Sequence, residues 1–186
     1  PMVIDTHQIH VTSSIGISIF PSDANSANGL IKKADLAMMH AKRTGRGEFQ
    51  LYTQDLNDKA HQRIMLENEL KYACQHKEFL NFYQPIIDNK NQKLVGVELL
   101  LRWQHEGRLV SPGVFIPVAE EMGLISQMTI DAIDTALSDY LRWQSRFPDL
   151  YVSINLSPVH ILQEGLSRSL LALLAKYDLP SKVLRL

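Results

Sequence analysis

The sequence has a single cysteine, no long apolar run and no excess of charge of either sign. Because Cys74 has no second thiol to pair with, an intramolecular disulfide is excluded, which fits a reducing compartment. The longest apolar runs, such as LLALLA at 170–175, are far shorter than the roughly 20 residues that cross a bilayer. We therefore expect a cytoplasmic segment that makes no membrane contact.

The charge balance excludes a second class of partner. The 19 Lys and Arg residues are matched by 20 Asp and Glu residues, which gives a formal net charge of −1. A protein that coats a nucleic acid polymer relies on bulk positive charge, so we expect no such partner. Small nucleotides stay candidate ligands, because a local site is enough to bind them.

The first residues do not resemble the start of a natural protein. Pro1 is not an initiator residue, and the first 20 residues lack the basic stretch and apolar core of a signal peptide. We expect the chain to be a piece of a longer parent protein. Any inner-membrane anchor of that parent would lie outside this segment.

The composition that is present is ordinary for a globular protein, with 45% hydrophobic and 21% charged residues in 186 positions. The first part predicts a β-hairpin within 1–20, a helix that ends at Gly45, and a strand at 48–52. A long polar helix with a narrow apolar stripe follows at about 54–77. We place the domain boundary on it, with a first portion at 1–53, the start of a linker helix at 54–65 and a second domain at 66–186.

From residue 80 the pattern changes to strands separated by helices. The predicted strands are 80–87, 94–103, 151–157 and 182–186, and the predicted helices are 114–122, 125–146 and 159–177. Such alternation is typical of right-handed βαβ units. We therefore expect a parallel sheet, either open or closed into a barrel.

Two of these strands carry polar side chains on one face. In VELLLRW, residues 97–103, alternation puts Glu98, Leu100 and Arg102 on one side and apolar residues on the other. Asn155 can face the same space if its strand joins that sheet. A carboxylate and an amide oxygen suit Mg²⁺, Mn²⁺ or Ca²⁺, and a guanidinium suits a phosphate. The pattern fits an ion pair between Glu98 and Arg102 equally well, with Asn155 satisfying a backbone group.

Several other ionisable residues have a simpler expected place. Four histidines are expected at the surface: His7, His10, His105 and His160. The first two fall on opposite faces of one strand, which argues against a shared metal. Glu120 and Glu121 either reach the pocket or form a solvated helix end.

The ordered blocks of the second region resemble a known family. VELLLRW is preceded by FYQPI and followed by SPGVFIPVAEEMGLI and VSINLSP. Over about residues 66–186 these blocks resemble the EAL family of cyclic di-GMP phosphodiesterases, with Leu99 in place of the signature alanine. The resemblance implies a (β/α)₈ barrel in which two Mg²⁺ or Mn²⁺ ions activate a water that cleaves cyclic di-GMP to linear pGpG.

The resemblance also implies a role for each matching residue. Glu98 and Asn155 would be catalytic metal ligands, and Arg102 would contact a phosphate. Gln84 and Leu100 would form the wall of the substrate pocket. These roles come from the family likeness and not from the spacing.

The first region resembles the C-terminal part of a GGDEF diguanylate cyclase domain, through VTSSIGISIFP and LIKKADLAMMHAKRTGRGEF. Lys42 and Arg46 match basic residues that contact a triphosphate in that family, whereas Met39 and Gly47 stand where Tyr and Asn are usual. The GGDEF signature itself would precede the first residue. The expected fold is α/β, a truncated (β/α)₈ TIM-type barrel preceded by the C-terminal hairpin, helix and strand of a GGDEF domain.

These resemblances lead to one expected function and two alternatives. We expect the parent to be a bacterial tandem GGDEF-EAL signalling protein that hydrolyses cyclic di-GMP, and the present piece to be inactive because the family's later metal-binding carboxylates are not in it. The first alternative is a non-catalytic module that binds cyclic di-GMP or GTP and signals through the 54–77 helix. The second is a purely structural segment. Half a barrel leaves open strand edges, so we also expect a homodimer.

Overall fold

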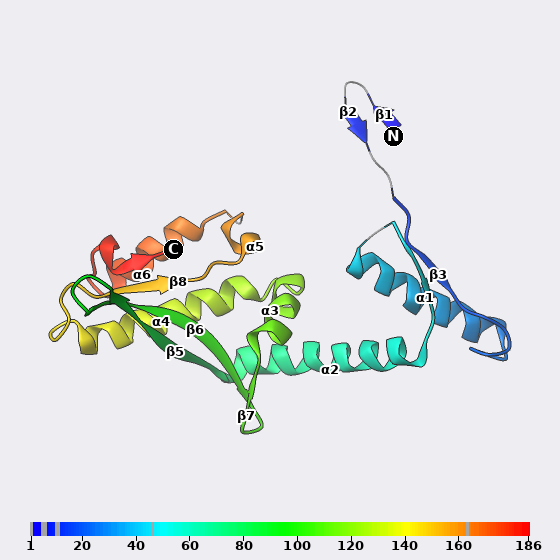
Figure 1. Cartoon of the computed structure of the whole chain (residues 1–186), viewed down its shortest axis with the longest axis horizontal. Helices are drawn as coiled ribbons and strands as arrows, with labels where there is room; N and C mark the ends of the chain where they lie inside the picture. Colours follow the sequence, from blue (N-terminus) through cyan, green and yellow to red (C-terminus); the bar gives the residue numbers. More distant parts are fainter. Residues whose placement is uncertain (1, 5–6, 10–11, 46, 163) are drawn as a thin grey trace. The chain divides into compact units, whose positions relative to one another are not determined.

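The computed structural model describes residues 2–4, 7–9, 12–45, 47–162 and 164–186 (Figure 1). The chain divides into two compact units, Pro1–Met65 and Leu66–Leu186, and each is described by itself. The division falls inside the long helix on which we placed the boundary. The assignment of the three stretches 1–53, 54–65 and 66–186 to separate domains stays a prediction.

The first unit contains a hairpin and a strand-helix-strand unit. Its strands and helix are β1 (Met2–Ile4), β2 (His7–Ile9), β3 (Ile15–Ile17), α1 (Ala27–Thr44) and β4 (Phe49–Leu51). β1 pairs with β2 antiparallel, whereas β3 pairs with β4 parallel across α1. The hairpin is therefore shorter than the predicted 1–20. A side chain at Gly16 would collide with the backbone of Ala34 and Met38, so glycine is what lets β3 lie against α1.

Both ends of α1 follow from local residues. Ser26 accepts a hydrogen bond from the amide of Gly29 at 3.2 Å and so caps the N-terminus. The amide of Gly45 donates to the carbonyl of Ala41, and the helix ends there as predicted. Ala37 is fully buried and packs with Tyr52 and Leu56 in the small core of this unit.

The helix α2 (Gln54–His76) confirms the predicted long polar helix. Its C-terminal half belongs to the second unit, where Leu70 and Ala73 are fully buried. The predicted apolar stripe is therefore a packing surface. No helix in the described parts of the chain is both long and apolar enough to cross a membrane.

The second unit is built on a five-stranded sheet. Its strands are β5 (Phe79–Asp88), β6 (Lys93–His105), β7 (Arg108–Val110), β8 (Tyr151–Ile154) and β9 (Leu184–Arg185). The order is β5-β6-β8-β9, and β7 pairs with the end of β6. β6, β8 and β9 are parallel as predicted, but β5 and β7 run antiparallel to β6. The prediction of a parallel sheet was wrong for β5 and β7. Both are joined to β6 by short turns, whereas parallel neighbours need a crossover connection of a dozen or more residues.

The helices of this unit are α3 (Pro112–Glu121), α4 (Ile125–Trp143), α5 (Pro158–Ile161) and α6 (Leu166–Lys176). The single helix predicted over 159–177 was wrong, since it is broken before Gly165, which has a φ of 96° and precedes α6. The strand predicted at 182–186 is shortened by a 3₁₀ turn at Ser181–Val183. The strand predicted at 151–157 ends at Ile154.

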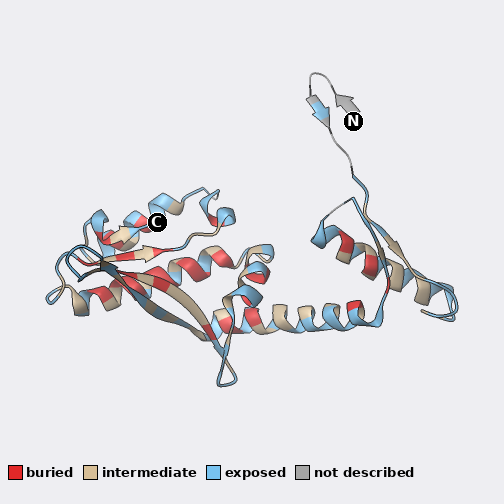
Figure 2. Ribbon diagram, viewed as in Figure 1, coloured by how far each residue is buried: buried red, intermediate tan, exposed pale blue. Residues whose placement is uncertain are grey.

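The two faces of the sheet have opposite environments. One face packs against α4 and α6, and its buried side chains include Val97, Leu99 and Val152 (Figure 2). The other face carries Phe82 and Glu98, which are exposed and half-buried respectively. The alternation predicted for 97–103 is confirmed, and the polar face of the sheet is the accessible one.

Candidate functional site

Two polar side chains meet on the accessible face at the C-terminal end of the short parallel ladder between β6 and β8, which pairs residues 96–99 with residues 151–154. Glu98 pairs in register with Ser153, and Asn155 follows the last residue of β8. The Nδ2 of Asn155 donates a hydrogen bond to Oε1 of Glu98 at 2.6 Å. The expectation that the two side chains face one space is therefore confirmed. Ligand sites of α/β sheets and barrels lie at this end of the strands.

The neighbouring strand adds to the same face. In the antiparallel register, Gln84 lies opposite Glu98, Phe82 lies opposite Leu100, and Leu80 lies opposite Arg102. Cross-strand neighbours of this kind are about 5 Å apart and share a face. The structure thus brings together the five residues that the resemblance singled out: Gln84, Glu98, Leu100, Arg102 and Asn155.

Arg102 makes contacts that separate the two interpretations of its strand. Its Nη1 donates to the carbonyl of Leu101 at 2.9 Å, and its guanidinium carbon lies 5.6 Å from the centroid of the Phe82 ring. Within the described residues it forms no ion pair with Glu98. Residues four apart in a strand are about 13 Å apart, which is too far for such a pair. The ion-pair alternative was therefore wrong, and Asn155 bonds a carboxylate and not a backbone group.

A cavity of about 370 Å³ opens beside these residues. Its polar lining includes Arg102, Glu120, Asn155 and Ser157, and α3 and α4 supply apolar lining such as Ile116, Ile125 and Ala132. The Oγ of Ser157 donates to Oε1 of Glu120 at 2.6 Å. We expected Glu120 either to reach the pocket or to form a solvated helix end, and it lines the pocket.

Glu98 and Asn155 offer the type of ligand atom that a hard divalent cation prefers, but two ligand residues are too few for a complete site. Glu98 keeps Oε2, and Asn155 keeps its amide oxygen Oδ1, which are oxygen ligands of the kind that Mg²⁺ and Mn²⁺ prefer. Binding a cation between them requires the Asn155 amide to turn, so that Oδ1 faces the carboxylate. The described residues contain no group of three or more His, Cys, Asp or Glu side chains placed to hold a metal.

The two basic residues predicted for the first region are not brought into a site. Lys42 is exposed in the last turn of α1. Arg46 lies outside the described residues. A role for either in binding a triphosphate therefore stays a prediction.

The position of His160 differs from the one predicted from the sequence. It is 3% exposed, so the expected surface position was wrong, and burial lowers the pKa of its imidazole. Its Nδ1 has no hydrogen-bond partner in the described part of the chain. His10 lies outside the described residues, and the side chain of His7 is not described.

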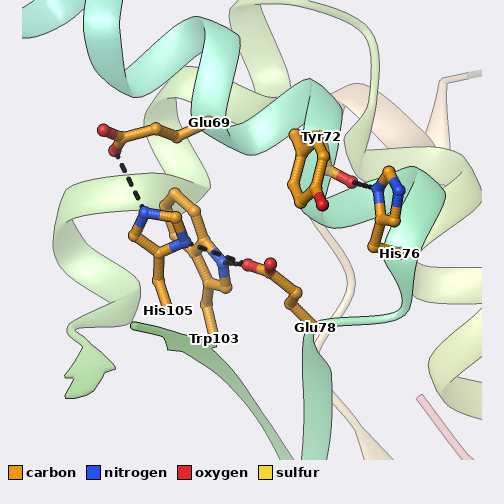
Figure 3. A network of polar contacts seen from close by, with 6 residues as sticks. All are labelled: Glu69, Tyr72, His76, Glu78, Trp103 and His105. Atoms are coloured by element: carbon orange, nitrogen blue, oxygen red, sulfur yellow. Dashed lines mark hydrogen bonds and ion pairs between the residues drawn. The ribbon is translucent and has the colours of Figure 1, made fainter. Parts of the chain in front are cut away.

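His105 belongs to a second polar cluster, which we call the Glu78 cluster: Glu69, Glu78, Trp103 and His105 (Figure 3). Oε2 of Glu78 accepts a hydrogen bond from Nε1 of Trp103 at 3.0 Å and lies 3.0 Å from Nδ1 of His105. Nε2 of His105 lies 3.9 Å from Oε2 of Glu69. The bond to Glu78 raises the pKa of His105, and the bonds from Trp103 and His105 lower the pKa of Glu78. His105 is half-buried, so its expected solvent exposure was wrong.

Two family models match the chain. The EAL domain matches residues 67–186, and the diguanylate cyclase GGDEF domain matches residues 1–48. Both resemblances drawn from the sequence are therefore confirmed, in the predicted order.

The chain is also similar to curated proteins that are named as cyclic di-GMP phosphodiesterases. The chain is 33% identical over 181 residues to the bifunctional diguanylate cyclase/cyclic di-GMP phosphodiesterase MucR of Pseudomonas aeruginosa, covering 96% of this chain and 26% of that protein. It is 30% identical over 158 residues to the cyclic di-GMP phosphodiesterase PdeR of Escherichia coli, covering 84% of this chain and 24% of that protein. The chain spans about a quarter of the length of the curated relatives it matches.

Solved structures share the fold of the second region. A complex of the MucR phosphodiesterase with cyclic di-GMP superposes with a TM-score of 0.61 at 32% identity, covering 64% of this chain and 49% of that chain. The cGMP-bound form of the EAL enzyme Bd1971 gives a TM-score of 0.62 at 29% identity, covering 88% and 43%. The expected fold, part of a TIM-like EAL barrel preceded by the end of a GGDEF domain, is confirmed. The chain therefore belongs to the EAL domain family, and its EAL region is preceded by a match to the GGDEF domain.

Proposed function

We propose that the full-length protein is a cyclic di-GMP phosphodiesterase that cleaves its substrate to linear pGpG. The observation that carries the proposal is the pair of Glu98 and Asn155, joined at 2.6 Å at the C-terminal end of the parallel ladder between β6 and β8. Arg102 and Gln84 share the accessible face with this pair. The names of the relatives at 33% and 30% identity, both cyclic di-GMP phosphodiesterases, support the proposal.

Each residue has a defined part in the proposed reaction. Glu98 and Asn155 would hold Mg²⁺ or Mn²⁺ through their oxygens, and such an ion, when bound, activates a water and neutralises charge on the phosphate. Arg102 donates N–H groups to a phosphate oxygen, because its backbone contact uses only one of five donors. Gln84 and Leu100 form the wall that orients the nucleotide.

The roles of the GGDEF part, the oligomeric state and the location of the protein are also proposals. Lys42 and Arg46 would be phosphate contacts of the GGDEF part. In the described sheet, β5 pairs with β6 alone, and such an edge strand offers unpaired backbone groups to a second copy, which supports the expected homodimer. The cytoplasm stays the proposed location.

A second candidate is a protein that binds cyclic di-GMP without cleaving it. One observation favours it: the carboxylate of Glu98 already accepts a hydrogen bond from the amide nitrogen of Asn155, so the amide oxygen of Asn155 does not face that carboxylate. Nucleotide binding needs Arg102 and the pocket wall, whereas hydrolysis needs a complete set of metal ligands.

Hydrolysis of cyclic di-GMP by the full-length protein, with Mg²⁺ or Mn²⁺ supplied, tests the proposal. We expect production of pGpG, and its loss in Glu98→Ala. Binding of the nucleotide without turnover would favour the second candidate. The absence of both would overturn the two proposals together. Hydrolysis by the present chain alone would contradict the expected inactivity of this piece.

A further inference from the structure

We infer that Glu120 is a positioning residue, which fixes the segment Asn155–Ser157 and thereby the position of Asn155 beside Glu98. The functional consequence of this inference rests on the proposed function, but its structural part does not. The inference starts from the end of β8. The last residue of the strand is Ile154, so Asn155 lies outside the backbone ladder that holds its neighbours.

The segment after the strand is fixed at Ser157. The carbonyl of Ser157 accepts hydrogen bonds from the amides of His160 and Ile161, and its Oγ accepts one from the amide of Val159 at 3.2 Å. Ser157 is thus the N-cap of α5. The cap ties Ser157 to the residues that come after it in α5 and does not tie it to the rest of the sheet.

Glu120 supplies that second connection. Its Oε1 accepts the Ser157 hydroxyl at 2.6 Å, across 37 residues of sequence. A hydroxyl has a single proton to donate, so this bond sets the direction of the Ser157 side chain. Hydrogen bonds from a hydroxyl to a carboxylate are short and are stronger than neutral ones.

Glu120 is itself held by a packed helix. Val118 and Ala119, the two residues before it on α3, are 2% and 0% exposed. The amide of Leu124 donates to the carbonyl of Ala119 and closes the turn after the helix. Glu120 therefore transmits the position of α3 to Ser157, two residues from Asn155.

The expected consequence follows from the geometry of the pair. A misplacement of about 1 Å at a reacting group costs up to a hundredfold in activity, even when its cause lies elsewhere. Without Glu120, we expect the Asn155 side chain to lose its fixed position beside Glu98, from which its amide oxygen can turn to a cation. Hydrolysis of cyclic di-GMP should then fall by about tenfold, which is the effect of about 1.4 kcal/mol on the activation free energy.

The test compares Glu120→Gln with Glu120→Leu. Glutamine keeps an acceptor oxygen for Ser157, whereas leucine keeps the approximate size and has none. The first measurement is the NMR chemical shift of the Asn155 side-chain amide in the present chain. We expect it to be unchanged in Glu120→Gln and displaced in Glu120→Leu. Val114→Ala, at a position of α3 that is 50% exposed, is the matched control and should leave it unchanged.

The second measurement is the rate at which the full-length variants hydrolyse cyclic di-GMP. A full rate in Glu120→Gln with about tenfold loss in Glu120→Leu supports the inference. An unchanged Asn155 signal in Glu120→Leu overturns it. If the unaltered protein does not hydrolyse cyclic di-GMP, the proposed function fails, and the amide signal still decides the role of Glu120.

A third variant covers the case in which Glu120→Leu does not fold. Ser157→Ala removes the hydroxyl that Glu120 holds and should displace the same amide signal. An unchanged signal in Ser157→Ala would also overturn the inference.

Discussion

Glu78 and Glu98 lie beside the same sheet but have different surroundings. Glu78 accepts hydrogen bonds from two neighbours, Trp103 and His105, and the other ring nitrogen of His105 lies 3.9 Å from Glu69 (Figure 3). Glu98 accepts one hydrogen bond, from the exposed Asn155, and the pocket of Arg102 and Asn155 lies beside it. A carboxylate surrounded by donors stabilises the fold, whereas one with a spare oxygen beside a cavity is available to a ligand.

The largest expected effect is at the centre of the Glu78 cluster. Trp103 is fully buried between α2 and α3, and Trp103→Ala removes both its packing and its hydrogen bond to Glu78. We expect the free energy of unfolding to fall by about 3–5 kcal/mol, measured by urea denaturation. Leu109→Ala, at a position that is 55% exposed, is the control and should change it by less than about 0.5 kcal/mol. A similar loss of stability in both variants would mean that the buried Trp103 contributes no more to the fold than an exposed side chain.

The two carboxylates can be exchanged for amides in parallel. Glu98→Gln should reduce hydrolysis of cyclic di-GMP by the full-length protein at least about a hundredfold, since an amide is a poorer cation ligand, and should change stability little. Glu78→Gln should affect stability and not activity. It should lower the free energy of unfolding by about 1–2 kcal/mol, because its hydrogen bonds are no longer charge-assisted, and leave hydrolysis within about twofold. If both variants lose activity to the same extent, the comparison between the two sites is wrong.

The pH dependence of stability should separate His105 from His160. The pKa of His105 is raised above its ordinary value of 6.5, mainly by Glu78 and further by Glu69 and Glu106, so its stabilisation is complete below 6.5 and is lost as the pH rises through the raised value. Burial lowers the pKa of His160, so its contribution is present above 6.5 and is lost as the pH falls.

Thermal melts of His105→Asn between about pH 4 and pH 9 measure the first effect and cover the acid side as well. We expect the variant to lose the decline in stability above pH 6.5 that the unaltered chain shows, and to keep the decline on the acid side. A variant whose melting temperature falls with pH as steeply as before would show that the Glu78 cluster does not titrate as described.

The smallest effect is expected at Phe82, whose ring lies against the guanidinium of Arg102. A cation–π contact at an exposed position contributes about 0.5–1 kcal/mol. Phe82→Leu in the full-length protein should therefore weaken cyclic di-GMP binding about two- to fivefold, measured by calorimetry. Phe82→Tyr keeps the ring and should bind as before. Equal affinity in the leucine variant would mean that the ring does not help to orient Arg102.

Local patterns predicted the elements whose signals are complete within a few residues. The two faces of the 97–103 strand and the end of α1 at Gly45 are of this kind, because alternation and capping are local. β7 was not predicted, since three residues give too short a pattern. The break between α5 and α6 was missed because a glycine within a helical pattern is often tolerated.

Features that depend on distant parts of the chain were harder to predict. The sequence around His160 says only that it follows a strand, and its burial comes from the packing of the α5 region. The bond between Glu120 and Ser157 joins α3 to α5, so neither local sequence contains a signal for it. Asn155 was placed correctly because β6 and β8 could be assigned to one sheet before their contact was known.

The separation of Glu98 from Asn155 along the chain bears on the order of folding. These two residues are 57 positions apart, whereas Glu78 and His105 are 27 apart and lie together at the open end of the antiparallel pair of β5 and β6. Contacts between distant positions require the closure of a longer loop, and here α3, α4 and β8 must be in place first. We expect pulse-labelled hydrogen exchange to protect β5 and β6 before β8. A newly synthesised chain would then acquire its stable hairpin before it acquires the ability to bind a ligand.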